Sequence, residues 1–158
     1  DEIEELVNID IPEYKNHFVV CGYGKLGREI IRQLKAKGCS YIVLENDVSL
    51  VERGKNSNDN VYYGNAVQKT TLEKAHIKSC IATIIAVSNE QKSELIANSI
   101  KDLGYNVNTI IRFADTIEKG LYTDFGDKFY LVKEREAVAN AIIGKALECK
   151  INNDLNQG

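Results

Sequence analysis

The segment HFVVCGYGKLGR, residues 17–28, carries the strongest structural signal in this chain. A short apolar run leads into a Gly-x-Gly-x-x-Gly pattern, and an amphipathic stretch follows immediately. This order of strand, glycine turn and helix is the context that a dinucleotide-binding turn requires. Gly22 permits a tight turn, Gly24 lets the backbone approach a phosphate closely, and Gly27 allows the helix to pack on the strand. We therefore expect the amides at the helix start, aided by the helix dipole, to bind phosphate.

A second apolar run, residues 41–44, ends in Glu45. A carboxylate at this distance from the glycine turn accepts hydrogen bonds from ribose hydroxyls. Its charge also repels a 2′-phosphate, so we expect NADP to be disfavoured relative to NAD(H), ATP, ADP or AMP. The alternative interpretation of both features is a tight turn beside a solvated acid.

Apolar runs and helical patterns alternate along the rest of the chain. The expected strands are residues 17–21, 41–45, 61–63, 81–87, 109–113 and 128–132. The expected helices are residues 26–37, 48–56, 70–76, 93–103, 116–125 and 134–149. Continuous apolar strands separated by helices indicate a parallel sheet that is covered on both faces. Together with the glycine turn, this predicts an α/β fold, a doubly wound, Rossmann-like six-stranded sheet in the order 3-2-1-4-5-6.

Length and composition limit the number of domains and the kinds of partner. The 158 residues suit one domain, and a net charge of −3 without a basic stripe argues against nucleic acid as a partner. Residues 1–16 are acidic and contain the single proline. We interpret them as a connector from a preceding region or as a disordered end. Residues 17–150 then form the ligand-binding lobe, and residues 151–158 form a frayed tail. The lack of methionine indicates a piece of a longer protein.

We find no group of residues in the sequence with the spacing of a catalytic or metal-binding site. The four cysteines are scattered, without metal-ligand spacing, and read as free thiols in a reducing compartment. His17 precedes the first strand and His76 follows the third, so neither lies where a substrate would meet a cofactor. We expect no catalytic residue and no metal site.

The last helix is unusual because residues 137–147 are apolar on nearly every side. A surface helix normally has a polar face. This pattern predicts that the helix packs on a neighbouring subunit or lobe. The alternative is ordinary coverage of the sheet by an alanine-rich helix.

Five blocks in this order carry a family resemblance: VCGYGKLGR (20–28), VLEND (43–47), YGNA (63–66), IAVSN (85–89) and IIRFAD (110–115). With them the chain resembles, over about residues 17–147, the N-terminal nucleotide-binding lobe of RCK domains (regulators of K⁺ conductance, also called KTN or TrkA-N). The family's third block normally reads Gly-Asp-Ala, and here Asn65 replaces the acid. An asparagine can still pair with an adenine edge, but without the charge.

The resemblance implies a cytoplasmic regulatory, gating domain of a potassium channel that binds an adenine nucleotide or NAD(H). It also implies a homo-oligomer, a dimer or an octameric ring, joined to a membrane pore domain at the cytoplasmic face of the membrane. The predicted ligand-binding residues are Gly22, Tyr23, Gly24, Lys25, Leu26, Gly27, Glu45, Asn46, Asn65, Ala66, Val87, Ser88 and Arg112. The alternatives are a regulatory subunit of a K⁺ uptake transporter or efflux system, a lobe with an empty pocket, and a fragment of an NAD-dependent oxidoreductase.

Overall fold

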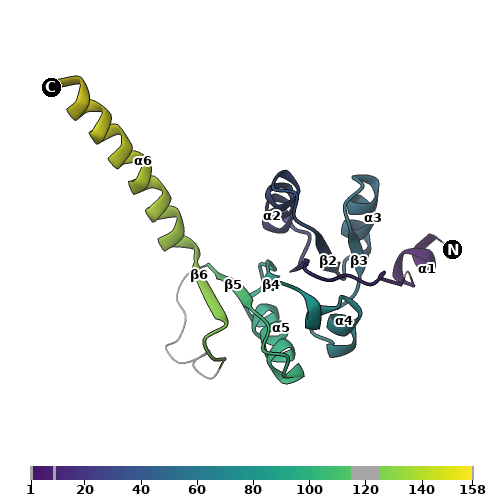
Figure 1. Ribbon diagram of the computed structural model, residues 1–158. Coiled ribbons are helices and arrows are strands. Elements are labelled where there is room, and N and C mark those ends of the chain that lie inside the picture. Colours follow the sequence, from purple (N-terminus) through teal and green to yellow (C-terminus); the bar gives the residue numbers. More distant parts are fainter. Residues whose placement is uncertain (1, 9, 115–124, 158) are drawn as a thin grey trace.

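The computed structural model describes residues 2–8, 10–114 and 125–157. Its centre is a six-stranded parallel sheet in the order β3-β2-β1-β4-β5-β6, with helices on both faces (Figure 1). The predicted doubly wound fold is therefore confirmed. The strands are β1 (Phe18–Cys21), β2 (Tyr41–Glu45), β3 (Val61–Tyr63), β4 (Ala82–Ile85), β5 (Thr109–Phe113) and β6 (Phe129–Lys133). The helices are α1 (Glu2–Val7), α2 (Lys25–Ala36), α3 (Val48–Asn56), α4 (Lys69–Lys74), the 3₁₀ helix η1 (Ile77–Ser79), α5 (Glu90–Leu103) and α6 (Glu134–Gln157).

Two apolar clusters, one on each face of the sheet, form the core. Val19 of β1 belongs to a cluster that also contains Leu72 of α4 and Ile96 of α5. Its neighbour Val20 belongs to a second cluster that contains Ile31 of α2 and Val51 of α3. Successive side chains of a strand point to opposite faces, so a strand between two helical layers must be apolar at every position. This is why the central strands read as continuous apolar runs.

The parallel register brings three strand ends to one edge of the sheet. Cys21, the last residue of β1, lies opposite Leu44 of β2 and Ile85 of β4. The turn after β1 therefore meets the turns after β2 and β4 at the carboxyl edge. In doubly wound sheets, the crevice at this edge is where ligands bind.

The segment before β1 lies against the body of the domain. Helix α1 contacts α3 and β3, and the side chains of Ile11 and Tyr14 pack against the first apolar cluster. The hydroxyl of Ser79 donates a hydrogen bond of 2.8 Å to the carbonyl of Tyr14. These contacts join residues 10–16 to the amino edge of the sheet.

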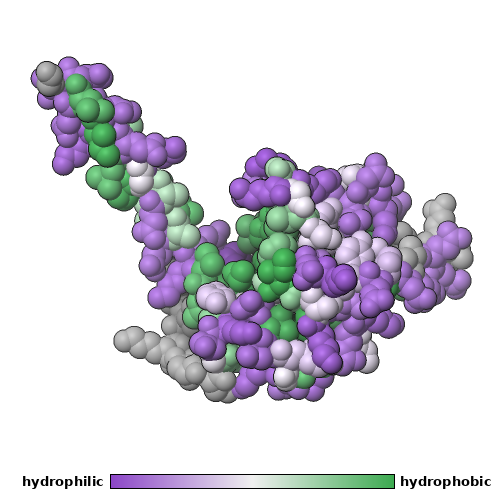
Figure 2. Space-filling view, viewed as in Figure 1, coloured by the Kyte–Doolittle hydropathy of each residue, from purple (hydrophilic) through white to green (hydrophobic). Residues whose placement is uncertain are grey.

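Helix α6 projects away from the sheet (Figure 1). None of its residues is buried, and its apolar side chains are more than half exposed. They are Val138, Ile142, Ile143, Leu147, Ile151 and Leu155. The helix thus does not cover its own sheet, and Figure 2 shows its apolar side chains open to solvent.

The largest differences from the predicted element boundaries are at α6 and α5. Helix α6 continues to Gln157, eight residues beyond the predicted end at Cys149. Helix α5 begins at Glu90 rather than at Ser93, because Asn89 caps it by accepting a hydrogen bond from the amide of Lys92. The predicted helix over residues 116–125 lies outside the described residues, except for Phe125.

Candidate functional site

The glycine turn has the geometry that its three glycines predict. Gly22 has a φ of +110°, and a Cβ there would lie 3.1 Å from the Val87 side chain. A Cβ on Gly27 would lie 2.0 Å from the carbonyl oxygen of Gly22, so the helix could not pack this closely with any larger residue. A Cβ on Gly24, in contrast, would meet no protein atom within 4 Å. The first and third glycines serve the protein's own packing, and the second borders open space.

That open space lies at the start of α2. Gly24 is the N-cap residue, and no side chain caps the helix. The first amides of a helix have no partner within the helix and carry the positive end of its dipole. An uncapped start beside a cavity is therefore suited to bind an anion such as a phosphate.

Glu45 fastens the glycine turn to the end of β2. Its Oε1 atom accepts a hydrogen bond of 2.8 Å from the amide of Tyr23. Its Oε2 atom accepts bonds of 2.8 and 2.9 Å from the amides of Asn46 and Asp47. A carboxylate has about four acceptor sites, so these bonds leave room for one ribose hydroxyl.

A cavity of about 540 Å³ opens at the carboxyl edge, between the glycine turn, the end of β4 and the start of α6. Eight predicted ligand-binding residues line it: Gly22, Gly24, Lys25, Leu26, Glu45, Val87, Ser88 and Arg112. Five lining residues were not predicted: Leu50, Ala86, Asn89, Lys92 and Glu134. Lys25, Lys92 and Arg112 bring positive charge to the walls, and Glu45 and Glu134 bring negative charge.

A second cavity, of only about 10 Å³, lies beside the first, with room for about one water molecule. Its lining includes Asn46 and Ala66, together with the apolar side chains of Leu44 and Ile96. Gly22, Glu45, Val87 and Lys92 line both cavities.

Cys21 also borders the small cavity, and burial raises the pKa of its thiol to about 12. That thiol stays neutral at physiological pH.

Three predicted residues line neither of these cavities. Tyr23 is buried behind the turn, and Gly27 packs against Gly22. Asn65 Oδ1 accepts a hydrogen bond of 3.1 Å from the amide of Val67, which closes a local turn after β3. These residues shape the walls of the cavities without facing them.

Arg112 joins the rim of the larger cavity to α6. One guanidinium nitrogen donates a 2.8 Å bond to Glu134 in the first turn of α6. Another donates to the carbonyl of Ser88 at 3.2 Å and lies 3.5 Å from that of Val87. Among the described atoms the buried Nε of Arg112 has no partner. Arg112 therefore forms an ion pair with Glu134 of the same chain.

Sequence reasoning missed Lys92 and Glu134 for different reasons. The prediction began α5 at Ser93 and so left Lys92 outside the helix. The capping residue Asn89 was the signal that could have moved that boundary. For Glu134 no signal existed, because its contact depends on the direction in which α6 leaves the sheet.

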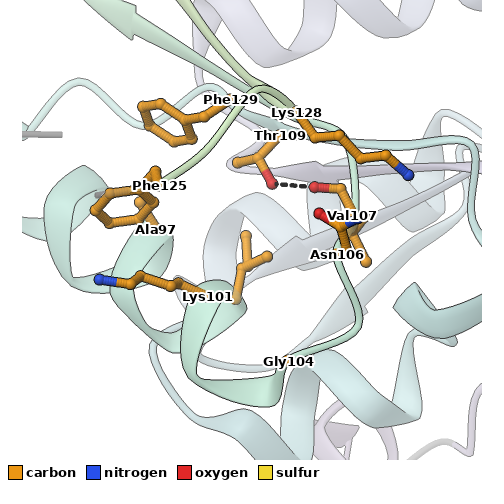
Figure 3. A pocket seen from close by; sticks show the side chains of 10 residues that line it. Ala97, Lys101, Gly104, Asn106, Val107, Thr109, Phe125, Lys128 and Phe129 are labelled. Carbon is orange, nitrogen blue, oxygen red and sulfur yellow. Dashed lines mark hydrogen bonds between the residues drawn. The ribbon is translucent and has the colours of Figure 1, made fainter. Parts of the chain in front are cut away.

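A further cavity, of about 200 Å³, lies at the opposite edge of the sheet, beside the end of α5 and the starts of β5 and β6 (Figure 3). The rings of Phe125 and Phe129 face each other on one side, with centroids 4.7 Å apart. The side chains of Lys101 and Lys128 extend in opposite directions (Figure 3). Carbonyl groups end α5 here, and the negative end of the helix dipole disfavours an anion.

Within residues 2–8, 10–114 and 125–157, no group of His, Cys, Asp and Glu side chains is arranged to hold a metal ion. In that same part of the chain, no helix combines the length and the apolar character that crossing a bilayer demands.

Potassium channel proteins are among the known sequences that this chain resembles. A sequence model of the TrkA-N domain matches residues 18–146. The chain is 29% identical over 99 residues to Potassium channel protein 1 of Methanocaldococcus jannaschii, covering 61% of this chain and 30% of that protein. It is 29% identical over 106 residues to the voltage-gated potassium channel Kch of Escherichia coli, covering 65% of this chain and 25% of the channel. The chain thus spans less than a third of the length of these relatives.

Solved structures share the fold. The NAD(P)-binding domain of an exopolyphosphatase-related protein from Archaeoglobus fulgidus superposes with a TM-score of 0.77 at 16% identity, over 85% of this chain and 99% of that one. The GsuK channel bound to NAD gives 0.68 at 16% identity, over 80% and 23% of the two chains, and GsuK was also solved with ADP. The Kef CTD of Shewanella denitrificans in its AMP-bound form gives 0.56 at 23% identity, over 84% and 80%.

Proposed function

Since the chain belongs to the TrkA-N domain family, we propose that it is a regulatory domain of a potassium channel that binds an adenine nucleotide or NAD(H). Binding at the carboxyl edge of the sheet changes the conformation of the domain, and the domain transmits this change to a pore. The potassium channels among its relatives support this role over an enzymatic one.

The observation that carries the proposal is the open space at Gly24. A phosphate there lies against the uncapped start of α2, and Lys25 and Glu45 line the same cavity. The thirteen residues predicted from the sequence are the ligand-binding set of this proposal. Most of them line the two adjacent cavities, and Tyr23, Gly27 and Asn65 support the walls.

The ligand class follows from Glu45 and the fold. A carboxylate that binds the ribose disfavours a 2′-phosphate, so NADP is a poor ligand. Structures of the same fold hold NAD, ADP or AMP. This supports an adenine nucleotide or NAD(H) here.

Helix α6 and the segment before β1 suggest two partners for the domain. The fully exposed apolar helix α6 is suited to pack on a second copy of the chain, as a dimer or within an octameric ring. Residues 1–16 connect the domain to a membrane pore, which places it at the cytoplasmic face of the membrane. A ligand acts on the pore only by the difference in its affinity for two arrangements of the assembled domains.

A second candidate is a regulatory subunit of a K⁺ uptake or efflux system, which the sequence similarity to the glutathione-regulated potassium-efflux system protein of Haemophilus influenzae supports. Catalysis by an oxidoreductase is the weakest candidate. Incubation with NADH and a panel of ketones tests it, since the proposed regulatory domain shows no turnover.

Calorimetry with NAD⁺, NADH, NADP⁺, ATP, ADP and AMP tests the proposal. At least one ligand other than NADP⁺ should bind with micromolar affinity. Gly24→Asp should abolish binding, because it places bulk and negative charge against the phosphates. Gln33→Glu, which adds the same charge to an exposed position of α2, should bind normally. Equal affinity of Gly24→Asp and the wild type would contradict the proposed site.

A further inference from the structure

Lys92 spans the crevice from one side to the other. It stands in the first turn of α5, where Asn89 fixes its backbone. Its ammonium group donates a 2.9 Å hydrogen bond to Oδ1 of Asn46, on the loop after β2. The contact thus links the start of α5, which follows β4, to the loop after β2, across the end of β1.

This lysine stands at the junction of the two cavities and lines both of them. The large cavity holds the phosphate-binding features, Gly24 and Lys25. The small cavity has the apolar side chains of Leu44 and Ile96 but only about 10 Å³ of space. A planar base does not fit in so small a space, and both partners of the contact, Lys92 and Asn46, are among its lining residues.

The position of Lys92 does not serve the stability of α5. A cation in the first turn of a helix faces the positive end of the helix dipole, which is unfavourable. The contact with Asn46 is exposed, and a single hydrogen bond makes only a modest net contribution to stability. The charge must therefore have another role, and the cavity that it faces is suited to anions.

We propose that Lys92 makes the site selective for nucleotides over nucleosides, by holding the small cavity closed until a phosphate in the large cavity attracts its ammonium group. A hydrogen bond from an ammonium group to a phosphate is charge-assisted and stronger than one to a neutral amide. A nucleotide therefore offers Lys92 a better partner than Asn46, and the adenine base enters the opened cavity. A nucleoside offers no such partner and must break the contact without compensation. This inference rests on the proposed nucleotide-binding function.

Calorimetry with AMP, ADP, NAD⁺ and adenosine tests the inference on the wild type and three variants. Lys92→Met should weaken binding of the phosphate-containing ligands about tenfold and strengthen that of adenosine several-fold. The ratio of the two affinities should fall at least tenfold. Asn46→Ala keeps the ammonium group that binds the phosphate, so the ratio of nucleotide to adenosine affinity should stay close to that of the wild type, whatever Asn46 itself contributes to ligand binding. Lys74→Met, which removes the same charge from an exposed position on α4, should match the wild type.

The outcomes separate this inference from the proposed function. An unchanged ratio in Lys92→Met, or a ratio in Asn46→Ala that falls as far as it does in Lys92→Met, overturns the role of Lys92 while nucleotide binding itself stands. If the wild type binds none of the four ligands, the proposed function and this inference both fail. Circular dichroism of each variant establishes that the fold is kept.

Discussion

The hydroxyl of Tyr23 donates a 2.5 Å hydrogen bond to the carboxylate of Asp59, which ties the glycine turn to the loop before β3. Asp59 also accepts hydrogen bonds from Lys35 at 2.8 Å and from Tyr41 at 3.2 Å. These bonds keep the pKa of Asp59 below its ordinary value although burial opposes this. Burial and the neighbouring carboxylate raise the pKa of Tyr23 to about 12. The turn is therefore anchored twice, through the amide of Tyr23 on Glu45 and through its side chain on Asp59.

Tyr23→Phe should lower both the stability and the ligand affinity of the domain. The variant keeps the buried ring and leaves Asp59 with one donor fewer. Hydrogen bonds to charged groups contribute about 1.5–3 kcal/mol, and we expect about 1–2 kcal/mol here because Asp59 keeps two other partners. Urea unfolding measures this loss, and calorimetry measures the affinity. Tyr41→Phe removes the longer bond to the same carboxylate and the bond from the Asn60 amide, but it leaves Tyr23 bonded to Asp59, so it should leave the affinity unchanged. Equal effects of the two variants on binding would contradict the anchoring role of Tyr23.

His17 should make the domain less stable in mild acid. It is buried, its Nε2 atom lies 2.9 Å from the carbonyl of Ala75, and burial lowers its pKa below 6.5. The unfolded chain therefore binds a proton at a higher pH than the folded domain does. Stability should be constant above about pH 7 and fall as the pH drops below 6.5, by at most about 1.4 kcal/mol per pH unit.

Urea unfolding at several pH values between 7.5 and 5 measures this dependence. His17→Gln, which keeps a donor near Ala75, should be less stable at pH 7.5 but lose less stability on acidification. If the two curves run parallel from pH 6.5 to 5, another group is responsible for the acid sensitivity.

The central part of the fold was predictable because its signals are local. The run of residues 18–21 and the glycines after it determine a strand, a turn and a helix through neighbouring residues alone. Glu45 was also found by its spacing, but the prediction gave it a ribose to bind and overlooked the three backbone amides that it already binds. Those amides belong to the turn itself, and only the folded turn reveals their direction.

The site residues that the sequence prediction missed make contacts between segments that lie far apart in the chain. Lys92 meets Asn46 across 46 positions of the sequence, and Arg112 meets Glu134 across 22. No periodicity in the chain encodes either distance. The apolar pattern of α6 was visible in the sequence, and it correctly indicated a helix that its own sheet does not cover.

Changes in α6 should alter self-association without unfolding the domain. Ile142 and Ile151 are 61% and 59% exposed, so an acid at either position adds no strain to the isolated chain. Ile142→Glu and Ile151→Glu should each shift the molecular mass seen by light scattering toward that of a monomer, because a buried acid opposes the apolar contact. Asn152→Glu, with the same new charge on the same helix, should have a smaller effect. A wild type that stays monomeric at high concentration would refute the proposal that a second copy covers α6.

Glu134 should compete with a bound nucleotide for Arg112. The guanidinium now binds Glu134, whose side chain is half exposed, and both residues line the large cavity. Glu134→Gln removes the competing charge but keeps the length of the side chain, so the phosphates of ADP gain a free arginine. We expect ADP to bind two- to fivefold more tightly by calorimetry. Arg112→Gln should weaken binding, and Glu148→Gln, which changes the same charge far along α6, should not affect it. Weaker ADP binding by Glu134→Gln would mean that the ion pair shapes the cavity rather than competing with the ligand.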